Sequence, residues 1–212
     1  PLPSFPHIHM FPPFAFSHSA ILSCQALRLG IALLEGGNAQ TQESFFQFFK
    51  GGDTTRFFKR IQDKMANSKL DMKNDEDSMS DKLASENSCM QAILRFLQLL
   101  CENHNSKLQN YLRFQSNNKT SFNLVLQTIK YIDYGIAMAI NDQNVPNVIQ
   151  VGHRCSIPFA LPLAFPPSFF SPSSLSSLFL MFHVLGAANL TEYCQGPCVA
   201  NQDTVASHES TG

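Results

Sequence analysis

The stretch MQAILRFLQLLCENHNSKLQNYLR, Met90 to Arg113, decides the predicted fold. In its first half the polar residues recur at helical spacing, at Gln91, Arg95, Gln98 and Glu102. The residues between them are apolar. A helix that keeps only one narrow stripe in water must be covered by other helices on its remaining sides. Two asparagines then interrupt the pattern, and a second amphipathic segment follows at once. This order predicts a short helix-turn-helix unit inside a stack of helices.

Upstream, residues 26–67 predict a helical repeat of the form helix, glycine pair, helix. An apolar segment and then a phenylalanine-rich segment each end before a glycine pair, at Gly36-Gly37 and at Gly51-Gly52. Glycine is the usual residue after a helix, because it tolerates a positive φ. Asp53 or Thr54 is expected to cap the helix that follows.

Downstream, Asn117-Asn118-Lys119 predicts a polar turn, and Thr120 or Ser121 is expected to cap a helix that carries an apolar ridge. Residues 89–150 are therefore expected to form the core helical module, and residues 188–212 its C-terminal helical part. Because no strand pattern appears, the predicted fold class is all-α. Stacked antiparallel helices of this kind favour an armadillo-like solenoid, whose layers contact only their neighbours.

Residues 68–88, SKLDMKNDEDSMSDKLASENS, change in character. Charged and small polar residues dominate, and apolar residues are too sparse to anchor a packed helix, which predicts an acidic polar linker. Asp75-Glu76-Asp77 is not expected to form a calcium loop, because the glycine and the closing glutamate of that motif are absent.

Two proline-rich stretches carry no charged side chain at all, residues 1–27 and 155–191. Proline at this density removes backbone donors and disfavours both helix and central strand. We weigh three interpretations. A transmembrane span at 169–188 is disfavoured by its serine-rich beginning, and a signal peptide by the missing basic residue at the N-terminus. The favoured hypothesis is translated intron at 1–25 and 151–187, because Phe, Ser, Pro and Leu dominate 156–182 as they would in a translated polypyrimidine tract.

The composition restricts the classes of partner and compartment. The chain has 212 residues and a formal net charge of -1, so it has no basic footprint for nucleic acid. Six cysteines at irregular spacings do not indicate a disulfide framework, and the absence of a charged leader in this sequence argues against secretion. A reducing, cytosolic environment is the expectation.

No pattern predicts a catalytic, cofactor-binding or metal-binding residue, and we expect no enzyme. The glycine pairs lack the lysine and the strand of a phosphate-binding loop. Cys194 and Cys198 with His208 form the best metal candidate, but no fourth ligand is evident, so ordinary buried or turn cysteines are favoured. Cys101 and His104 have the spacing of a dyad on one helix face, yet the apolar setting of Cys101 favours core packing.

Several long motifs resemble the homology-associated segment shared by inositol trisphosphate receptors and ryanodine receptors. They are ILRFLQLLCENHN at Ile93–Asn105, QNYLR at Gln109–Arg113 and LTEYCQGPC at Leu190–Cys198. Shorter motifs favour the inositol trisphosphate receptors: IALLEGGN at Ile31–Asn38, NNKT at Asn117–Thr120 and HES at His208–Ser210. Two departures stand out. The segment at 134–137 is shorter than in the family, and the family runs directly into LTEYC where this chain inserts 151–187.

The resemblance implies a fragment of the cytosolic coupling region of a ligand-gated calcium-release channel, which relays ligand-induced motion to the pore. It implies a homotetramer in the endoplasmic reticulum membrane, with this segment on the cytosolic side and in contact with other domains and subunits. The fragment itself would contact neither ligand nor pore, and no cofactor is implied. The alternative interpretation is a free-standing helical-repeat adaptor protein. A membrane-anchored protein that uses residues 159–188 also stays open.

Overall fold

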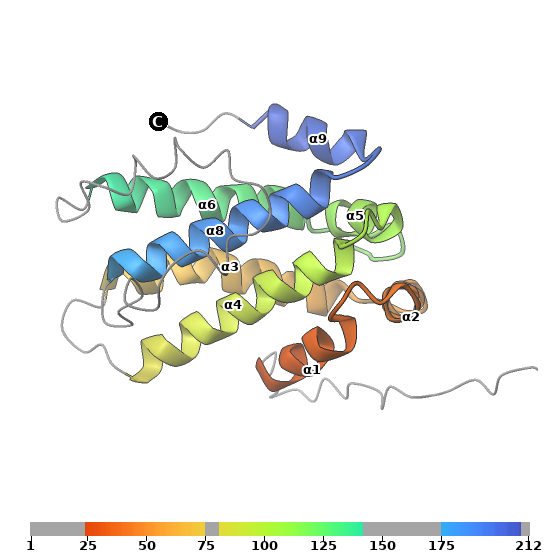
Figure 1. Ribbon diagram of the computed structural model, residues 1–212, viewed down its shortest axis with the longest axis horizontal. Helices are drawn as coiled ribbons and strands as arrows, with labels where there is room; N and C mark the ends of the chain where they lie inside the picture. Colours follow the sequence, from red (N-terminus) through yellow and green to blue (C-terminus); the bar gives the residue numbers. More distant parts are fainter. Residues whose placement is uncertain (1–23, 75–80, 142–174, 209–212) are drawn as a thin grey trace, which may run out of the picture.

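The computed structural model describes residues 24–74, 81–141 and 175–208, and all the secondary structure within them is helical (Figure 1). This confirms the predicted all-α class. The helices are α1 (Cys24–Leu34), α2 (Ala39–Lys50), α3 (Thr55–Asn74), α4 (Asp81–Cys101), α5 (Ser106–Arg113), α6 (Leu124–Asn141), α8 (Leu175–Cys194) and α9 (Val199–Ala206).

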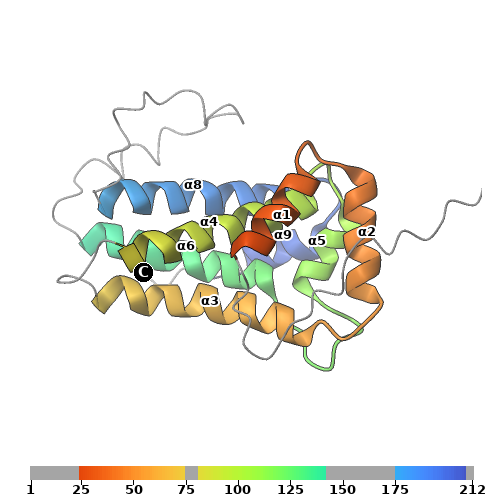
Figure 2. The same ribbon diagram turned by 90° about the horizontal axis from the view of Figure 1, so that it is seen from below.

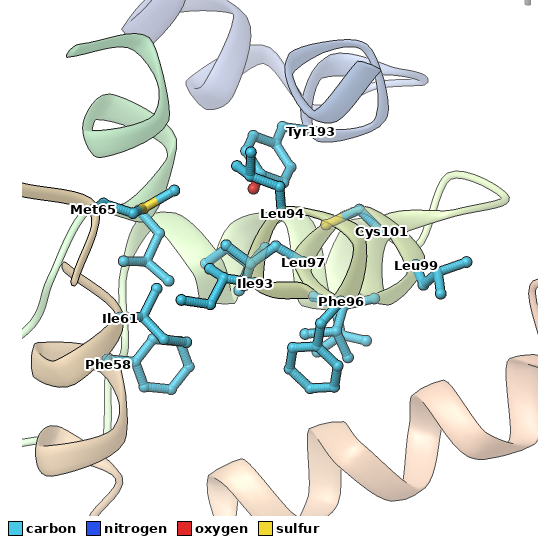
Figure 3. Packing of buried hydrophobic residues seen from close by; sticks show 14 of the residues in the cluster. Phe58, Ile61, Met65, Ile93, Leu94, Phe96, Leu97, Leu99, Cys101 and Tyr193 are labelled. Carbon is cyan, nitrogen blue, oxygen red and sulfur yellow. The ribbon is translucent and has the colours of Figure 1, made fainter. Parts of the chain in front are cut away.

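Helix α4 is the centre of the core, as the quoted stretch predicts. It contacts α1, α3, α5 and α8. Ile93, Leu94 and Leu97 are fully buried, and even Gln98 of the expected wet stripe is buried. Figure 3 shows how this is achieved: Tyr193 of α8 lies over Leu94, while Ile61 and Met65 of α3 lie beside Ile93. Burial on all these sides explains why so few polar residues interrupt the sequence of this helix.

The long helices pack side by side. Helix α6 contacts both α3 and α8, and α8 also contacts α4. Seen along the direction of Figure 2, α4 and α6 lie between α8 on one side and α3 on the other, while α2 stands across one end of these helices. Gly186 of α8 is buried against Ile132 of α6, so the two helices approach closely there. The armadillo-like solenoid remains a prediction.

The predicted acidic linker at 68–88 is wrong for part of its length. Helix α3 continues to Asn74, and α4 begins at Asp81. The segment contains neither glycine nor proline. Once packing has stabilised the first turns of a helix, each added residue gains a backbone hydrogen bond, so the helix extends through such a segment. Asp75-Glu76-Asp77 lies outside the described residues.

The two segments predicted to be unstructured also need correction at their edges. Cys24 and Gln25 belong to α1, and residues 175–187 belong to α8. Helix α8 ends in the packed LTEYC motif, which supplies a nucleus, and the leucines, phenylalanines and methionine before it propagate the helix toward Pro172. The remainder of both segments lies outside the described residues, so the intron hypothesis stays a hypothesis.

One cap differs from the prediction. Asn123 caps α6, because its side-chain oxygen accepts a hydrogen bond from the backbone N–H of Leu126 at 2.9 Å. Ser121, a predicted cap, instead donates to and accepts from Gln115. At the start of α3, Asp53 accepts the N–H of Thr55 at 2.9 Å, as expected of a capping residue. Among the described helices, none has the length and apolar character needed to cross a bilayer.

Candidate functional site

The C-terminal end of α8 is held by side-chain amides. The last carbonyl groups of a helix lack partners within the helix, and Pro197, just beyond, has no N–H to offer. Gln109 of α5 donates from Nε2 to the carbonyl oxygens of Glu192 at 2.7 Å and Gln195 at 2.9 Å. Asn201 of α9 donates to the carbonyl of Tyr193 at 2.9 Å. We call Gln109 an amide clamp, meaning a buried glutamine whose Nε2 atom donates to two carbonyl oxygens at the end of a helix in another element.

The C-terminal end of α4 is held in the same way from the other side. Gln42 of α2 donates from Nε2 to the carbonyl oxygens of Leu99 and Glu102, both at 2.9 Å. Its Oε1 accepts a hydrogen bond from Asn105. Gln42 and Gln109 are both fully buried or nearly so, at 1% and 0% exposed. Each amide clamp makes one buried bond, to Leu99 or to Glu192, and one partly buried bond, to Glu102 or to Gln195. A partner lost from a buried bond is costly.

The turn between α4 and α5, Glu102–Asn105, lies between these two amide clamps. Asn103 and His104 both adopt a left-handed backbone, with φ of 62° and 60°. This conformation costs energy in non-glycine residues and persists only where neighbours impose it. Asn103 donates to the carbonyl of Gly37 at 3.2 Å, and the ring of His104 packs beside Gly196. The turn thus touches the α1–α2 loop on one side and the α8–α9 loop on the other.

Two carboxyl groups meet at this turn. Glu102 closes α4, and Glu192 stands in the last turn of α8, where it is 2% exposed. Each has a buried Oε2 atom without a hydrogen-bond partner. An unpaired buried carboxylate oxygen is rare and expensive. We therefore call Glu102 and Glu192 the acidic pair and treat it as the most chemically active feature of the described residues.

The electrostatics of the acidic pair favour neutralisation. Burial raises the pKa of Glu192, and the neighbouring charge of Glu102 raises the pKa further. His104 and Arg95 act in the opposite direction and lower it. Both a proton and a cation would relieve the repulsion between the two carboxylates. The acidic pair therefore favours ionic interactions, with a proton or with a cation.

The structure separates the residues of the metal candidate. His208 lies 2.6 Å from the Oδ2 atom of Asp133 on α6, through its Nε2 atom. Cys194 ends α8 and is half-buried, while Cys198 precedes α9 and is buried. Within 24–74, 81–141 and 175–208, no group of three or more His, Cys, Asp or Glu side chains is arranged to hold a metal ion.

The other sequence candidates also find places in the structure. Cys101 is fully buried in the core, and burial raises the pKa of its thiol well above the usual value, so the core-packing interpretation accounts for it. His104, its suggested partner, is exposed in the left-handed turn. The glycine pairs fall at the ends of α1 and α2, where they serve as helix stops.

The central part of the chain is similar to a known protein family. Residues 84–153 match the family described as RyR and IP3R Homology associated. Residues 84–153 are thus similar to this homology-associated segment. It includes most of α4, all of α5 and α6, and therefore the turn that contributes Glu102 to the acidic pair.

A curated relative supports the same assignment. The chain is 36% identical over 145 residues to the inositol 1,4,5-trisphosphate receptor of Caenorhabditis elegans, over 64% of this chain and 4% of that receptor. The chain thus spans a small part of the length of this relative. The resemblance inferred from the motifs is confirmed, and the homology-associated segment ends close to the point at which the proposed insert begins.

Sequence reasoning did not find the acidic pair. The sequence pattern places Glu102 in the polar stripe of a covered helix, and Glu192 within a motif. Their positions at the C-terminal ends of two helices were a usable signal, since a carboxylate is disfavoured beside the unpaired carbonyl groups there. Their proximity, however, depends on the packing of α4 against α8, which the spacing of residues within each helix does not specify.

Proposed function

We propose that the chain is part of the cytosolic coupling region of an intracellular ligand-gated calcium-release channel, in the endoplasmic reticulum membrane, and relays ligand-induced motion toward the pore. Its family and its relative are channel receptors. The observation that carries the proposal is the pair of amide clamps. They join the end of α4 to α2 through Gln42 and the end of α8 to α5 through Gln109.

This arrangement transmits displacement because its joints are specific and each includes a buried hydrogen bond. A movement of α2 pulls on the carbonyl groups that end α4, and the α4–α5 turn passes it to α5 and α8. Buried hydrogen bonds resist stretching more strongly than solvated ones, since water cannot replace a lost partner. Packed helices with such joints move as bodies rather than deform. The proposal needs neither a catalytic residue nor a pore within the segment.

A chimeric channel tests the proposal. In the C. elegans receptor, the aligned portion is replaced by the corresponding residues of this chain, and calcium release from microsomes is measured against inositol trisphosphate concentration. We expect the chimera to open. Gln42→Leu in the chimera should shift the half-maximal concentration upward by about tenfold, the effect of a coupling change near 1.4 kcal/mol, with ligand binding unchanged.

The matched control is Gln47→Leu on the same helix, because Gln47 is exposed and bonds only within α2, to Glu43. It should release calcium like the parent chimera. Equal release from the Gln42→Leu and Gln47→Leu chimeras would contradict the relay. A complete transcript of this length in the organism of origin would instead favour the free-standing adaptor.

The acidic pair favours a second, regulatory function. We propose that Glu102 and Glu192 take up a divalent cation of the calcium type, for which carboxylate oxygens are the preferred ligands. The supporting observation is the buried, unpartnered Oε2 atom on each glutamate. Bound there, the cation would draw the ends of α4 and α8 together at the same turn that the amide clamps hold. This goes beyond the sequence-based expectation of no metal ligand.

The cation proposal predicts opposite effects of Glu192→Gln on two measurements. In the parent chain, calcium in millimolar excess should raise the melting temperature, and the variant should lose this increase. Without calcium at neutral pH, however, the variant should melt higher than the parent. The reason is the raised pKa of Glu192: the folded state favours the protonated form, so ionisation costs stability.

The pH dependence follows from the same sign. Stability of the parent should fall as pH rises from the usual glutamate range through the raised pKa of the folded state. The advantage of Glu192→Gln should therefore vanish in acid. Asp203→Asn on exposed α9 is the control, with no expected effect on either measurement. A calcium-induced increase that survives in Glu192→Gln would refute the cation site.

A further inference from the structure

A disulfide joins the first residue of α1 to α4. Cys24 and Cys89 are bonded through their sulfur atoms, with a Cα–Cα distance of 5.3 Å and a sequence separation of 65 residues. Cys89 is 5% exposed at the start of the buried part of α4, whereas Cys24 is only partly buried. Cys24 is therefore the more exposed of the two bonded residues, and the side from which a small thiol would approach the bond.

The other described cysteines are not equivalent to this pair. Cys101, Cys194 and Cys198 are free thiols. Burial raises the pKa of Cys101 and of Cys194, which lowers the fraction of reactive thiolate. Among the described cysteines, Cys24 and Cys89 are the two that are joined to each other, and the other three are free.

The disulfide fixes α1 at its N-terminal end, opposite to its loop contact. At the C-terminal end of α1, Gly37 is tied to Asn103 by a hydrogen bond. Leu27, Gly30 and Leu34 give α1 a single buried stripe, and Gly30 lies against the ring of Phe96. The first turn of the helix has only Leu27 from this stripe, so the bond to Cys89 supplies much of its attachment.

We propose that Cys24–Cys89 is a reversible redox latch that holds the N-terminal end of α1 on α4. In a compartment with glutathione, such a bond is conditional rather than permanent. It reaches across the boundary of the homology-associated segment, since Cys89 lies within 84–153 and Cys24 lies outside it. Opening the latch frees the start of α1 while the α4–α5 turn and both amide clamps stay in place.

The exchange needs only a small thiol. The thiolate of one glutathione attacks Sγ of Cys24, the Cys24–Cys89 bond breaks, and the electron pair leaves on Sγ of Cys89, which takes up a proton. A second glutathione attacks the glutathione sulfur of the mixed disulfide and releases the thiol of Cys24. The products are two protein thiols and one molecule of glutathione disulfide, which is the oxidant for the reverse reaction.

The test equilibrates the full chain with a series of glutathione and glutathione disulfide ratios. Alkylation followed by peptide mass mapping measures the linked fraction, and hydrogen exchange measures the amides of α1. We expect Cys24 and Cys89 to convert together from linked to alkylated. In the reduced form, the first turns of α1 should exchange faster by about tenfold or more, with α5 unchanged.

Two variants complete the test. Cys24→Ser should show the fast exchange of α1 at every ratio, and Cys194→Ser, which removes a half-buried free thiol, should behave like the parent. Equal protection of α1 in the oxidised and reduced chains would overturn the latch. So would a peptide map that links Cys24 to another cysteine or leaves it unlinked at every ratio.

Discussion

Leu97→Asp is expected to unfold the chain. Leu97 is fully buried in the C-terminal part of α4, a helix that contacts α1, α3, α5 and α8. The variant removes a buried leucine, which costs about 2–5 kcal/mol, and places a carboxylate in the core without a partner. The sum is comparable to the entire free energy of unfolding of a typical domain, about 5–15 kcal/mol. Thermal melting followed by circular dichroism measures the loss.

The control is Leu29→Asp on α1, where the leucine is 57% exposed. The same chemical change there should alter the free energy of unfolding by less than about 1 kcal/mol, as is usual for surface positions. If Leu97→Asp melted like the parent chain, the assignment of the covered face of α4 would be wrong.

Gln109→Leu should produce the second largest loss. The variant keeps the volume of the side chain but leaves the carbonyl oxygens of Glu192 and Gln195 without their donor. Each buried carbonyl that loses its partner costs about 1–3 kcal/mol, so we expect a loss of about 2–5 kcal/mol. The Oε1 atom of Gln109, itself buried without a partner, offsets part of this cost when it is removed.

Gln202→Leu is the control that tests whether burial, rather than location at this helix end, determines the strength of the amide clamp at Gln109. Gln202 also donates to two carbonyl oxygens at the same helix end, those of Cys194 and Gly196, but these bonds are exposed. Water replaces an exposed donor, and the expected loss is below about 1 kcal/mol. Urea titration of both variants gives the comparison. Similar losses would mean that burial does not set the strength of the clamp at Gln109.

Much of the fold could be predicted from periodicity. The stripe on α4 indicated a covered helix, and the structure buries Ile93, Leu94 and Leu97 completely. The glycine pairs correctly placed the ends of α1 and α2. These predictions are correct because the buried face and the ends of a helix are both determined by residues that lie close together in the sequence.

The failures have a common physical origin. Residues 68–74 and 175–187 are helical although their own pattern predicted otherwise, because a helix nucleated by packing elsewhere extends through them. Gln109 bonds to Glu192 across 83 positions in the chain. Cys24 bonds to Cys89 across 65. Such pairings depend on the tertiary arrangement, and neither partner carries a local signal for the other.

The candidate site lay between these two cases. The motifs that resemble the homology-associated segment contain Glu102 and Glu192, so both residues of the candidate site lie within stretches that the sequence singles out. The motifs do not indicate a role for them, since a glutamate in a helical stripe is ordinarily a solvated surface residue. Only the burial of their unpaired oxygen atoms distinguishes them.

The contact of Gly37 with Asn103 makes substitutions at these two positions depend on each other. Gly37 has a φ of 65°, and any side chain added there would collide with the amide of Asn103. A larger residue at position 37 is therefore compatible with this architecture only if the Asn103 side chain rotates away or becomes smaller, and either change gives up the bond between the α1–α2 loop and the left-handed turn. Each of the two residues thus restricts the substitutions that the other position accepts, although they lie 66 residues apart.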